Sequence, residues 1–429
     1  MKKTIPVLFL LLSCLLLPLF VLFGEGDTRF GTGALIADAL ASMGLQGAEG
    51  EAEEVFGEGG ILENPSFEEP LFRPDDEALS ALSTSAGHAA LLTDDGRLLY
   101  GKNENERAGM ASTTKIMTAL LAAEYIEEKG LETEIVVPAA TAGIEGSSVY
   151  LKAGERVRLL DLLYATLLAS ANDGAATLAV AVAGDIDSFV ERMNERAEEL
   201  GLVNTHFINP HGLSDEEHYT TAYELGILAA HAMQNELFAK VCATKNYTFA
   251  GEGITRSLTN HNRMLFSYPG AIGVKTGFTK ATGRCLVTAA ERDGVRLIAV
   301  TLDASDDWND HRAMLDHGFS LLEAVTLASA GEHAYTLPVV NGSAATVDAV
   351  NRETLSLVLR RDHGVITFSV ELPSFLYAKV QEGDLVGRVI FYENGKKIGE
   401  IPLTAASTVD SVEYEKSFGE RLKSLLGLS

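Results

Sequence analysis

Ser112 and Lys115 place a hydroxyl and an amine at a spacing that could support nucleophilic catalysis. They open a stretch whose apolar residues recur with helical spacing, from Ser112 to about Lys129. Side chains three positions apart share one face of a helix, so the amine can reach the hydroxyl. A serine becomes a nucleophile when a base removes its proton, and a lysine can be that base when burial or a second cation lowers its pKa. Taken alone, the pair also fits a helix-capping serine followed by a surface lysine.

Two further motifs follow along the chain, and both carry groups that can bind a peptide. Ser170 and Asn172 form a Ser-x-Asn motif after an apolar helix, a pattern that alone indicates a loop with a helix cap. Lys275, Thr276 and Gly277 end an expected strand, where they can bind a carboxylate and let a substrate backbone approach closely. The ordered combination of the three motifs is far more specific than any one of them. It is typical of serine β-lactamases and penicillin-binding proteins.

Longer strings around these motifs strengthen the likeness. The chain resembles the low-molecular-mass penicillin-binding proteins, which are D-alanyl-D-alanine carboxypeptidases of serine peptidase family S11 that trim peptidoglycan. The likeness is strong from about Ser83 to Leu322 and extends more loosely to the C-terminal β segment that such enzymes carry. The matching strings are 167–173, 201–207, 209–213, 218–222 and 273–279.

The resemblance implies a reaction in two halves, without a metal or other cofactor. Ser112 would attack the D-Ala–D-Ala carbonyl and expel D-alanine, and water would then hydrolyse the acyl-enzyme. Lys115 would be the base, and Ser170 would relay a proton toward the leaving D-alanine. β-Lactam antibiotics would acylate the same serine.

The resemblance also implies a substrate-binding set. Asn172 would bind the stem peptide of peptidoglycan, and Lys275 with Thr276 would hold its terminal carboxylate, next to Gly277. The backbone N–H groups of Phe278 and of the nucleophile would form the oxyanion hole, in which one donor is worth on the order of 3 kcal/mol. The sequence departs from the family pattern at one place, where it has acidic residues. The pair 306–307 is Asp-Asp, where relatives often carry a basic residue, so the full carboxylate-binding set stays open.

The elements that must position these residues suggest an α+β layer fold. Strand patterns stand at both ends of the region and helical patterns between them. The resemblance makes this the penicillin-binding/β-lactamase-like transpeptidase fold, an antiparallel sheet with helices. We expect a hairpin over 89–100, helices over 112–129, 159–168, 175–182 and 187–200, an irregular stretch over 204–219, and strands over 271–276, 285–290 and 297–302.

The flanking regions differ in composition from this middle part. The sequence predicts a catalytic domain over 83–325, a small all-β domain over 326–410 that acts as a spacer or docking surface, and a short amphipathic tail over 411–429. Short alternating runs and the turn Asn394-Gly395 carry the β prediction. Membrane binding and simple packing are both open for the tail.

The first 23 residues predict export. Lys2 and Lys3 precede an apolar run that is long enough to span a bilayer, so we expect an anchor on the outer face of the cytoplasmic membrane. A cleaved signal, which would release the protein, is the alternative. Residues 24–82 form an acidic linker whose composition predicts disorder. With 34 basic and 60 acidic residues in the chain, nucleic acid is excluded as a partner.

The remaining motifs indicate no second chemistry. Three cysteines without a CxxC pair exclude a zinc finger; a Cys242–Cys285 bridge is possible, but two buried free thiols fit better. The histidines lack metal-ligand spacing. Two alternatives to a carboxypeptidase remain: a serine β-lactamase, although Glu198 and Glu199 lack the spacing of its deacylating carboxylate, and a catalytically idle wall-binding module.

Overall fold

A computed structural model describes residues 82–251 and 254–412 of the chain. The predicted anchor, nearly all of the predicted linker, Cys14 and most of the predicted tail lie outside these residues. The described part has the expected α+β class, with a small all-β domain at its C-terminal end.

A five-stranded antiparallel sheet lies at the centre of the catalytic region, in the order β2-β1-β11-β10-β9. The predicted hairpin near the N-terminal end of the region pairs with the last of the three later strands, so the two ends of the region meet in one sheet. Asp293 and Gly294 both have positive φ in the turn between β10 and β11. Such a turn matches the twist of the two strands it joins. The strands are β1 (His88–Thr93), β2 (Leu98–Lys102), β9 (Ala271–Thr279), β10 (Gly283–Arg292) and β11 (Val295–Ala304).

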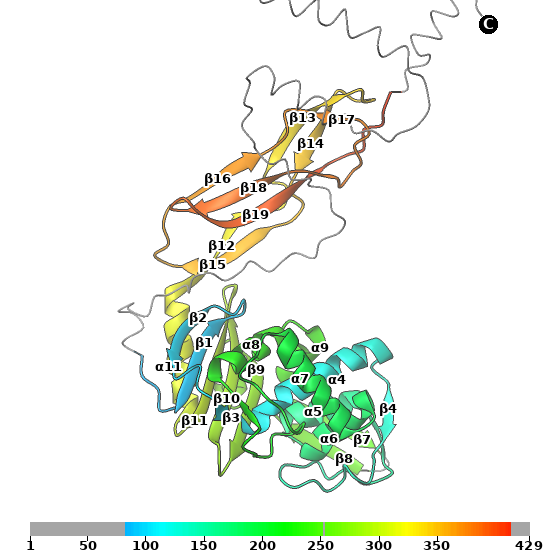
Figure 1. Ribbon diagram of the computed structural model, residues 1–429, viewed down its shortest axis with the longest axis vertical. Helices are drawn as coiled ribbons and strands as arrows, with labels where there is room; N and C mark the ends of the chain where they lie inside the picture. The colour runs from blue at the N-terminus through cyan, green and yellow to red at the C-terminus, as the bar shows by residue number, and fades with distance from the viewer. Residues whose placement is uncertain (1–81, 252–253, 413–429) are drawn as a thin grey trace, which may run out of the picture. The chain divides into compact units, whose positions relative to one another are not determined.

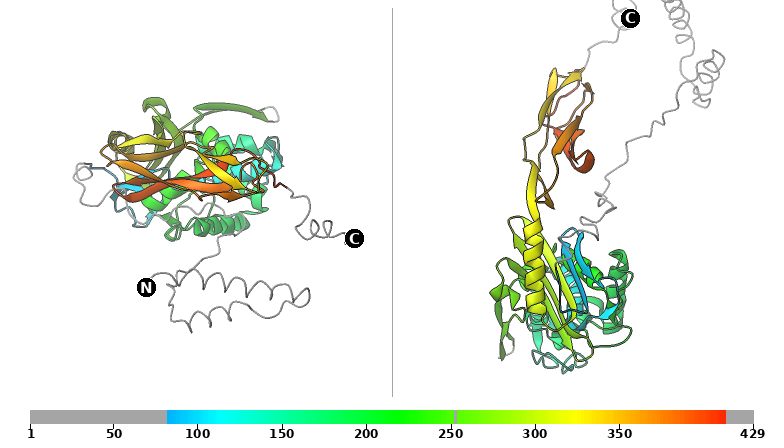
Figure 2. Two further views of the ribbon diagram at one scale, coloured as in Figure 1. Left: turned by 90° about the horizontal axis from the view of Figure 1, so that it is seen from above. Right: turned by 90° about the vertical axis from the view of Figure 1, so that its left-hand side faces the viewer.

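Each face of this sheet buries a separate apolar core, because successive side chains of a strand point to opposite faces. Leu91 packs into the core that includes Met314 and Leu315 of α11 (Asp307–Leu321). Leu92, the next residue, packs into the larger core formed with the other helices. Figures 1 and 2 show α11 along one side of the sheet and the helical layer on the other.

The helical region contains the predicted helices and others that the sequence pattern did not predict. α5 (Leu159–Leu168) has its expected bounds, whereas α6 (Asn172–Ala183) begins three residues earlier than expected. The helix predicted over 112–129 is the 3₁₀ turn η1 (Ala111–Thr114) followed by α4 (Lys115–Lys129), and the helix predicted over 187–200 is α7 (Ile186–Glu199). The helices α8 (Ala222–Ala232), α9 (Glu236–Cys242) and α10 (Met264–Ser267) were not predicted. Short strand pairs complete the region: β3 (Ala108–Gly109) with β6 (Tyr219–Thr220), β4 (Glu134–Val136) with β5 (Arg156–Arg158), and β7 (Asn246–Gly251) with β8 (Ile254–Thr259).

The C-terminal region is all-β. A six-stranded sheet in the order β16-β18-β19-β14-β13-β17 accompanies a two-stranded sheet of β12 and β15. The predicted Asn394-Gly395 hairpin is confirmed, and both turn residues have positive φ. The strands are β12 (Leu322–Ala328), β13 (Ala334–Val340), β14 (Thr346–Val350), β15 (Leu355–Arg360), β16 (Ile366–Glu371), β17 (Leu376–Tyr377), β18 (Leu385–Glu393) and β19 (Lys396–Ala405).

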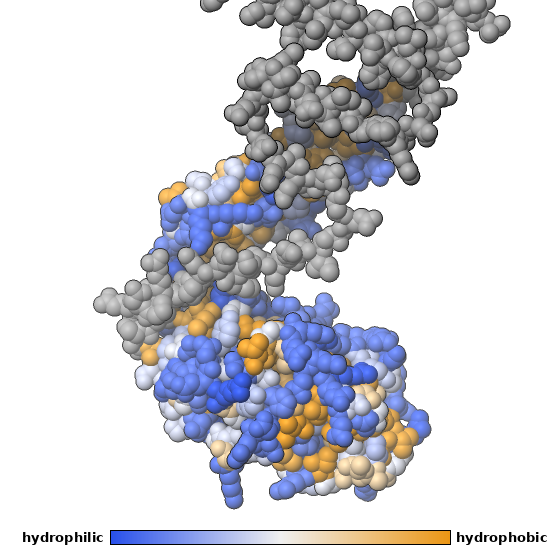
Figure 3. Space-filling view, in the orientation of Figure 1, coloured by the Kyte–Doolittle hydropathy of each residue, from blue (hydrophilic) through white to orange (hydrophobic). Residues whose placement is uncertain are grey.

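The described surface is mostly hydrophilic on the face seen in Figure 3, with apolar patches over the helical region. Within 82–251 and 254–412, no helix combines the length and the apolar character needed to cross a membrane. Cys242 and Cys285 are both free and buried, which confirms the favoured prediction over a disulfide. Burial raises the pKa of each thiol to about 12, so both remain protonated.

Candidate active site

Ser112 lies in a 3₁₀ turn, η1, directly before α4. Ala111 beside it has a φ of 46°, a conformation that costs energy for a residue with a side chain. Two hydroxyls stabilise this turn: Thr113 Oγ1 donates to the Met110 carbonyl at 2.5 Å, and Thr114 Oγ1 donates to the Ala111 carbonyl at 2.7 Å. The turn therefore fixes the backbone from which the Ser112 hydroxyl projects.

Lys115 is fully buried, and three oxygens surround its amine. Nζ lies 2.9 Å from Ser112 Oγ, 2.7 Å from Asn172 Oδ1 and 2.5 Å from the His211 carbonyl oxygen. The amide oxygen and the carbonyl oxygen can only accept hydrogen bonds. A neutral amine would donate its two N–H groups to them, and its lone pair would then be left to accept the Ser112 hydroxyl proton. The geometry is that of a base hydrogen-bonded to a nucleophile.

Electrostatics favour the neutral form of this amine. Burial, and next the positive charge of Lys275, hold the pKa of Lys115 well below its usual value of 10.5, although Asp173 opposes the shift. Taking an ammonium out of water favours its deprotonated form. The condition that the sequence analysis set for a lysine base is therefore met.

The carbonyl that contacts Lys115 comes from a segment in the irregular stretch after α7. Gly212 in this segment has a φ of 85°, and a Cβ there would lie only 1.9 Å from the Ala111 carbonyl oxygen. Thr118 of α4 donates to the Pro210 carbonyl at 2.6 Å. The segment therefore packs directly on the start of α4 and holds the His211 carbonyl against the lysine. The sequence motifs did not predict a role for this segment.

The second motif lies at the N-terminal end of α6. Ser170 is buried and has a φ of 58°, a conformation uncommon for a serine. Asn172 Nδ2 donates to the Glu145 carbonyl at 2.6 Å, and its backbone N–H donates to the Ser147 carbonyl at 2.7 Å. These bonds orient the amide so that its oxygen faces Lys115.

The loop on which Asn172 rests is itself held by buried charges. Asp173 accepts hydrogen bonds from the Ser148 hydroxyl and from the backbone N–H groups of Val149 and Leu151. Arg256 donates to the Val149 carbonyl at 2.7 Å and forms a buried ion pair with Glu155. This clamp fixes the loop against the Ser-x-Asn motif.

The third motif lies on the edge strand β9. Lys275 is buried, and its Nζ donates to the Thr276 carbonyl at 2.9 Å. Burial lowers the pKa of Lys275 to about 7. A Cβ at Gly277 would lie 3.0 Å from the Ser112 backbone nitrogen, so glycine permits the close approach of β9 to the nucleophile. Phe278 follows with its ring exposed.

One cavity of about 440 Å³ brings the three motifs together. Five of the eight predicted site residues line it, namely Ser112, Ser170, Thr276, Gly277 and Phe278. The other three, Lys115, Asn172 and Lys275, are buried beside these residues in the same motifs. The structure therefore assembles all eight in one place.

The cavity is also lined by residues outside the three motifs. Ser147, His261 and Arg284 line it, together with Asp307 and Trp308. Arg284 stands directly opposite Phe278 in the pairing of β10 with β9. A basic residue at the start of an otherwise apolar strand is the signal that could have identified it.

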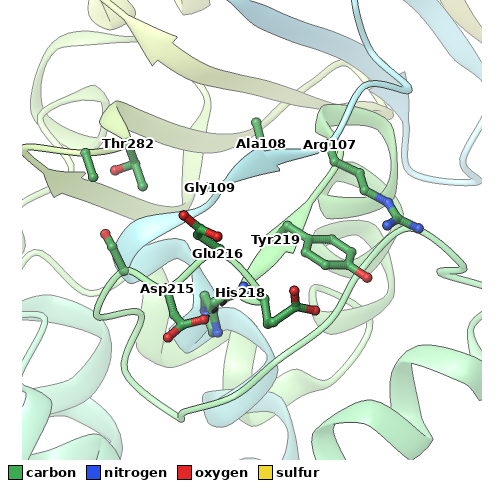
Figure 4. Close-up of a pocket in the computed structure, with 11 residues that line it drawn as sticks. Arg107, Ala108, Gly109, Asp215, Glu216, His218, Tyr219 and Thr282 are labelled. Atoms are coloured by element: carbon green, nitrogen blue, oxygen red, sulfur yellow. Dashed lines mark hydrogen bonds between the residues drawn. The ribbon is translucent and has the colours of Figure 1, made fainter.

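A larger cavity of about 640 Å³ holds none of the eight predicted residues (Figure 4). Acidic side chains such as Asp215 and Glu216 line it, and Arg107 lies over the Tyr219 ring at 4.4 Å. Because five of the eight predicted residues line the smaller cavity, we place the candidate active site there.

Within the described residues, no cluster of three or more His, Cys, Asp or Glu side chains could hold a metal ion.

A serine that contacts a buried lysine with a lowered pKa, beside an antiparallel sheet flanked by helices, defines a class of acyl-transferring serine enzymes. Penicillin-binding proteins belong to this class. Residues 76–306 match the D-alanyl-D-alanine carboxypeptidase family, and residues 322–411 match the C-terminal domain of penicillin-binding protein 5. The chain belongs to the D-alanyl-D-alanine carboxypeptidase family, serine peptidase family S11. It is a serine-type hydrolase of that specificity.

Individual relatives agree with this assignment. The chain is 32% identical to D-alanyl-D-alanine carboxypeptidase DacF of Bacillus subtilis over 342 residues, which cover 78% of this chain and 88% of that one. It is 31% identical to DacC of Escherichia coli over 361 residues, covering 79% and 89%. The crystal structures of penicillin-binding protein 5 from Haemophilus influenzae match with a TM-score of 0.62 at 25% identity, covering 77% and 98%. The predicted family, fold class and enzyme class are thereby confirmed.

Proposed function

We propose that Ser112 is the acylated nucleophile of this carboxypeptidase and that Lys115 is its general base. The observation that carries the proposal is the surroundings of Lys115 Nζ, where two proton-free acceptors take its N–H groups and leave its lone pair for the Ser112 hydroxyl. A base with a lowered pKa in hydrogen-bond contact with the nucleophile is the usual arrangement for this chemistry.

The acylation step follows from these positions. Lys115 takes the Ser112 proton as the oxygen attacks the carbonyl of the penultimate D-alanine. The backbone N–H groups of Ser112 and Phe278 stabilise the oxyanion. The proton then passes to the leaving amine through Ser170, which lines the same cavity, and D-alanine departs.

The binding roles follow the same lines. Asn172 holds the peptide, and Lys275 and Thr276 hold its terminal carboxylate beside Gly277. Water then attacks the ester and releases the shortened peptide. No step in this scheme requires a metal ion or an organic cofactor.

We propose the pentapeptide stem of peptidoglycan as the substrate and β-lactams as covalent inhibitors. A penicilloyl group keeps its leaving group attached and blocks the path of water, whereas D-alanine diffuses away. Glu198 and Glu199, the carboxylates considered for a β-lactamase, are exposed at the end of α7 and do not line the cavity. We therefore expect slow release of penicilloyl.

A paired assay tests the proposal. The enzyme should release free D-alanine from a peptide ending in D-Ala-D-Ala and should turn penicillin over only slowly. Rapid penicillin turnover without D-alanine release would favour the β-lactamase. Neither activity, with muropeptide binding intact, would favour the idle binding module.

We also propose that the enzyme works on the outer face of the cytoplasmic membrane. The charge and apolar length of residues 1–23 support an N-terminal anchor, and the acidic composition of 24–82 supports a linker to a catalytic domain over 83–325. The β domain over 326–410 would be a spacer or docking surface. Cell fractionation tests the anchor, since enzyme recovered from the medium without residues 1–23 would show a cleaved signal.

A further inference from the structure

Arg284 lines the cavity, and the proposed mechanism gives its charge no role. It lies at the start of β10, opposite Phe278 on the edge strand. Residues directly opposite each other on paired strands project from the same face of the sheet, so Arg284 and Phe278 share a face. Thr276, two positions before Phe278 on the same strand, also projects from that face. The guanidinium therefore lies on the face that carries the proposed carboxylate-binding hydroxyl.

Two residues at the start of α11 hold this guanidinium in place. Arg284 Nη2 donates to Asp307 Oδ1 at 2.6 Å, and the side chain of Asp307 is only 4% exposed. The guanidinium carbon lies 5.6 Å from the centre of the Trp308 ring. Both partners belong to the start of α11, and such a double anchor orients the planar fork.

One donor of this anchored fork is left without a partner. Arg284 Nε is inaccessible to solvent and has no hydrogen-bond acceptor among the described residues. A buried donor of a charged group is costly to leave unpaired, and such groups are nearly always satisfied in native proteins. The rest of the guanidinium remains open to the cavity, because the side chain as a whole is 43% exposed, so a ligand carboxylate can reach it there.

The other cation of the site is poorly suited to meet a carboxylate alone. Lys275 is 1% exposed, and its amine already donates to the Thr276 carbonyl. Burial lowers the pKa of Lys275 to about 7, so its positive charge is only partial at neutral pH. Among the residues that line the cavity, Arg284 is the one with a permanent positive charge.

We propose that Arg284, oriented by Asp307 and Trp308, receives the free C-terminal carboxylate of the substrate and selects peptides that carry one. The start of α11 is acidic at Asp306 and Asp307, so the cation at this end of the cavity comes from β10. The inference rests on the proposed function, because it assigns specificity to the same site.

Two peptides that differ only at the C-terminus test this role. One ends in D-Ala-D-Ala with a free carboxylate, and the other ends in the corresponding carboxamide. The measured quantity is kcat/KM for release of D-alanine or D-alaninamide. The matched control is Arg292→Gln, because Arg292 lies on the same strand, pairs with Asp316 of the same helix and stacks on Tyr268, away from the cavity.

In Arg284→Gln the ratio of kcat/KM for acid over amide should fall roughly 10-fold or more, the usual worth of a hydrogen bond to a charged group. Arg284→Lys should restore part of the ratio, because it returns the charge without the fork. Arg292→Gln should keep the ratio within about 2-fold of wild type. Stoichiometric acylation by saturating penicillin verifies that each variant retains a working nucleophile.

An unchanged ratio in Arg284→Gln would overturn the inference. If that variant does not fold, the wild-type enzyme still provides a test. Equal wild-type kcat/KM values for the acid and the amide peptide would show that no group of the site recognises the carboxylate. Failure of the proposed function is distinguishable, since wild type would then release neither D-alanine from the acid nor D-alaninamide from the amide.

Discussion

The Glu155–Arg256 pair should be a main stabilising element of the loop on which Asn172 rests. The two side chains are 2% and 7% exposed and are joined by hydrogen bonds of 2.6 and 2.9 Å. Arg256 also donates to the Val149 and Tyr150 carbonyls at 2.7 and 3.1 Å. We consider Glu155→Met, Arg256→Met and the double variant.

The expected free energies follow from burial. Either single variant leaves one charge buried without its partner, which costs about 3–5 kcal/mol. The double variant buries no charge. It loses bonds to three backbone groups, the Val149 and Tyr150 carbonyls and the Lys152 N–H, at about 1 kcal/mol each, or about 3 kcal/mol together. The double variant should therefore be at least as stable as the more strongly destabilised of the two single variants.

Urea unfolding followed by the fluorescence of Trp308, the only tryptophan, measures these values. A double variant destabilised by the sum of the single effects would refute the reasoning. The pH dependence gives a second reading. Burial raises the pKa of Glu155, but hydrogen bonds from Arg256 and from the Lys152 backbone outweigh it, so the folded pKa is lowered. The pair's contribution is present above the usual carboxyl pKa of 4.5 and is lost as the pH falls through the folded value.

Three further predictions concern the site. Lys115→Ala should slow acylation by penicillin roughly 10²–10⁴-fold, and Ser112→Ala should abolish it, with no further loss in the double variant; substantial residual acylation in Lys115→Ala would point to another base. The acylation rate should rise with pH as Lys115 loses its proton. Lys275→Met should move this rise to higher pH, because it removes the positive charge that lowers the pKa of Lys115. A pH–rate profile that does not move in this variant would contradict the prediction. Gly277→Ala should slow acylation by up to about 10²-fold by displacing the turn, whereas Gly87→Ala, whose Cβ would make only an ordinary 3.5 Å contact, should leave the rate unchanged.

The motif residues could be predicted from the sequence because their chemistry depends on local spacing. Three positions on a helix bring Ser112 and Lys115 together, and the turn signals gave the hairpins. The surroundings of Lys115 could not be predicted in this way. The His211 carbonyl comes from a segment 96 residues away, and its position depends on the packing of Gly212 against η1.

Two kinds of feature could not be predicted from the sequence pattern, for physical reasons. α8 is buried on most of its surface, so its apolar residues show little of the one-sided periodicity that reveals a helix. The first turn of α6 contains Asn172, Asp173 and Gly174, which favour loops, and buried tertiary hydrogen bonds override that preference. The position of Arg284 depends on the register of β10 against β9, which spacing along one strand does not reveal.

The central claim is that Ser112 is the nucleophile, and the mass of the intact protein after reaction with penicillin tests it most directly. Wild type should gain the mass of one penicillin molecule, and peptide mapping should place the adduct on Ser112. Ser112→Ala should show no adduct under the same conditions. An adduct that survives this substitution would contradict the assignment of the nucleophile and the mechanism built on it.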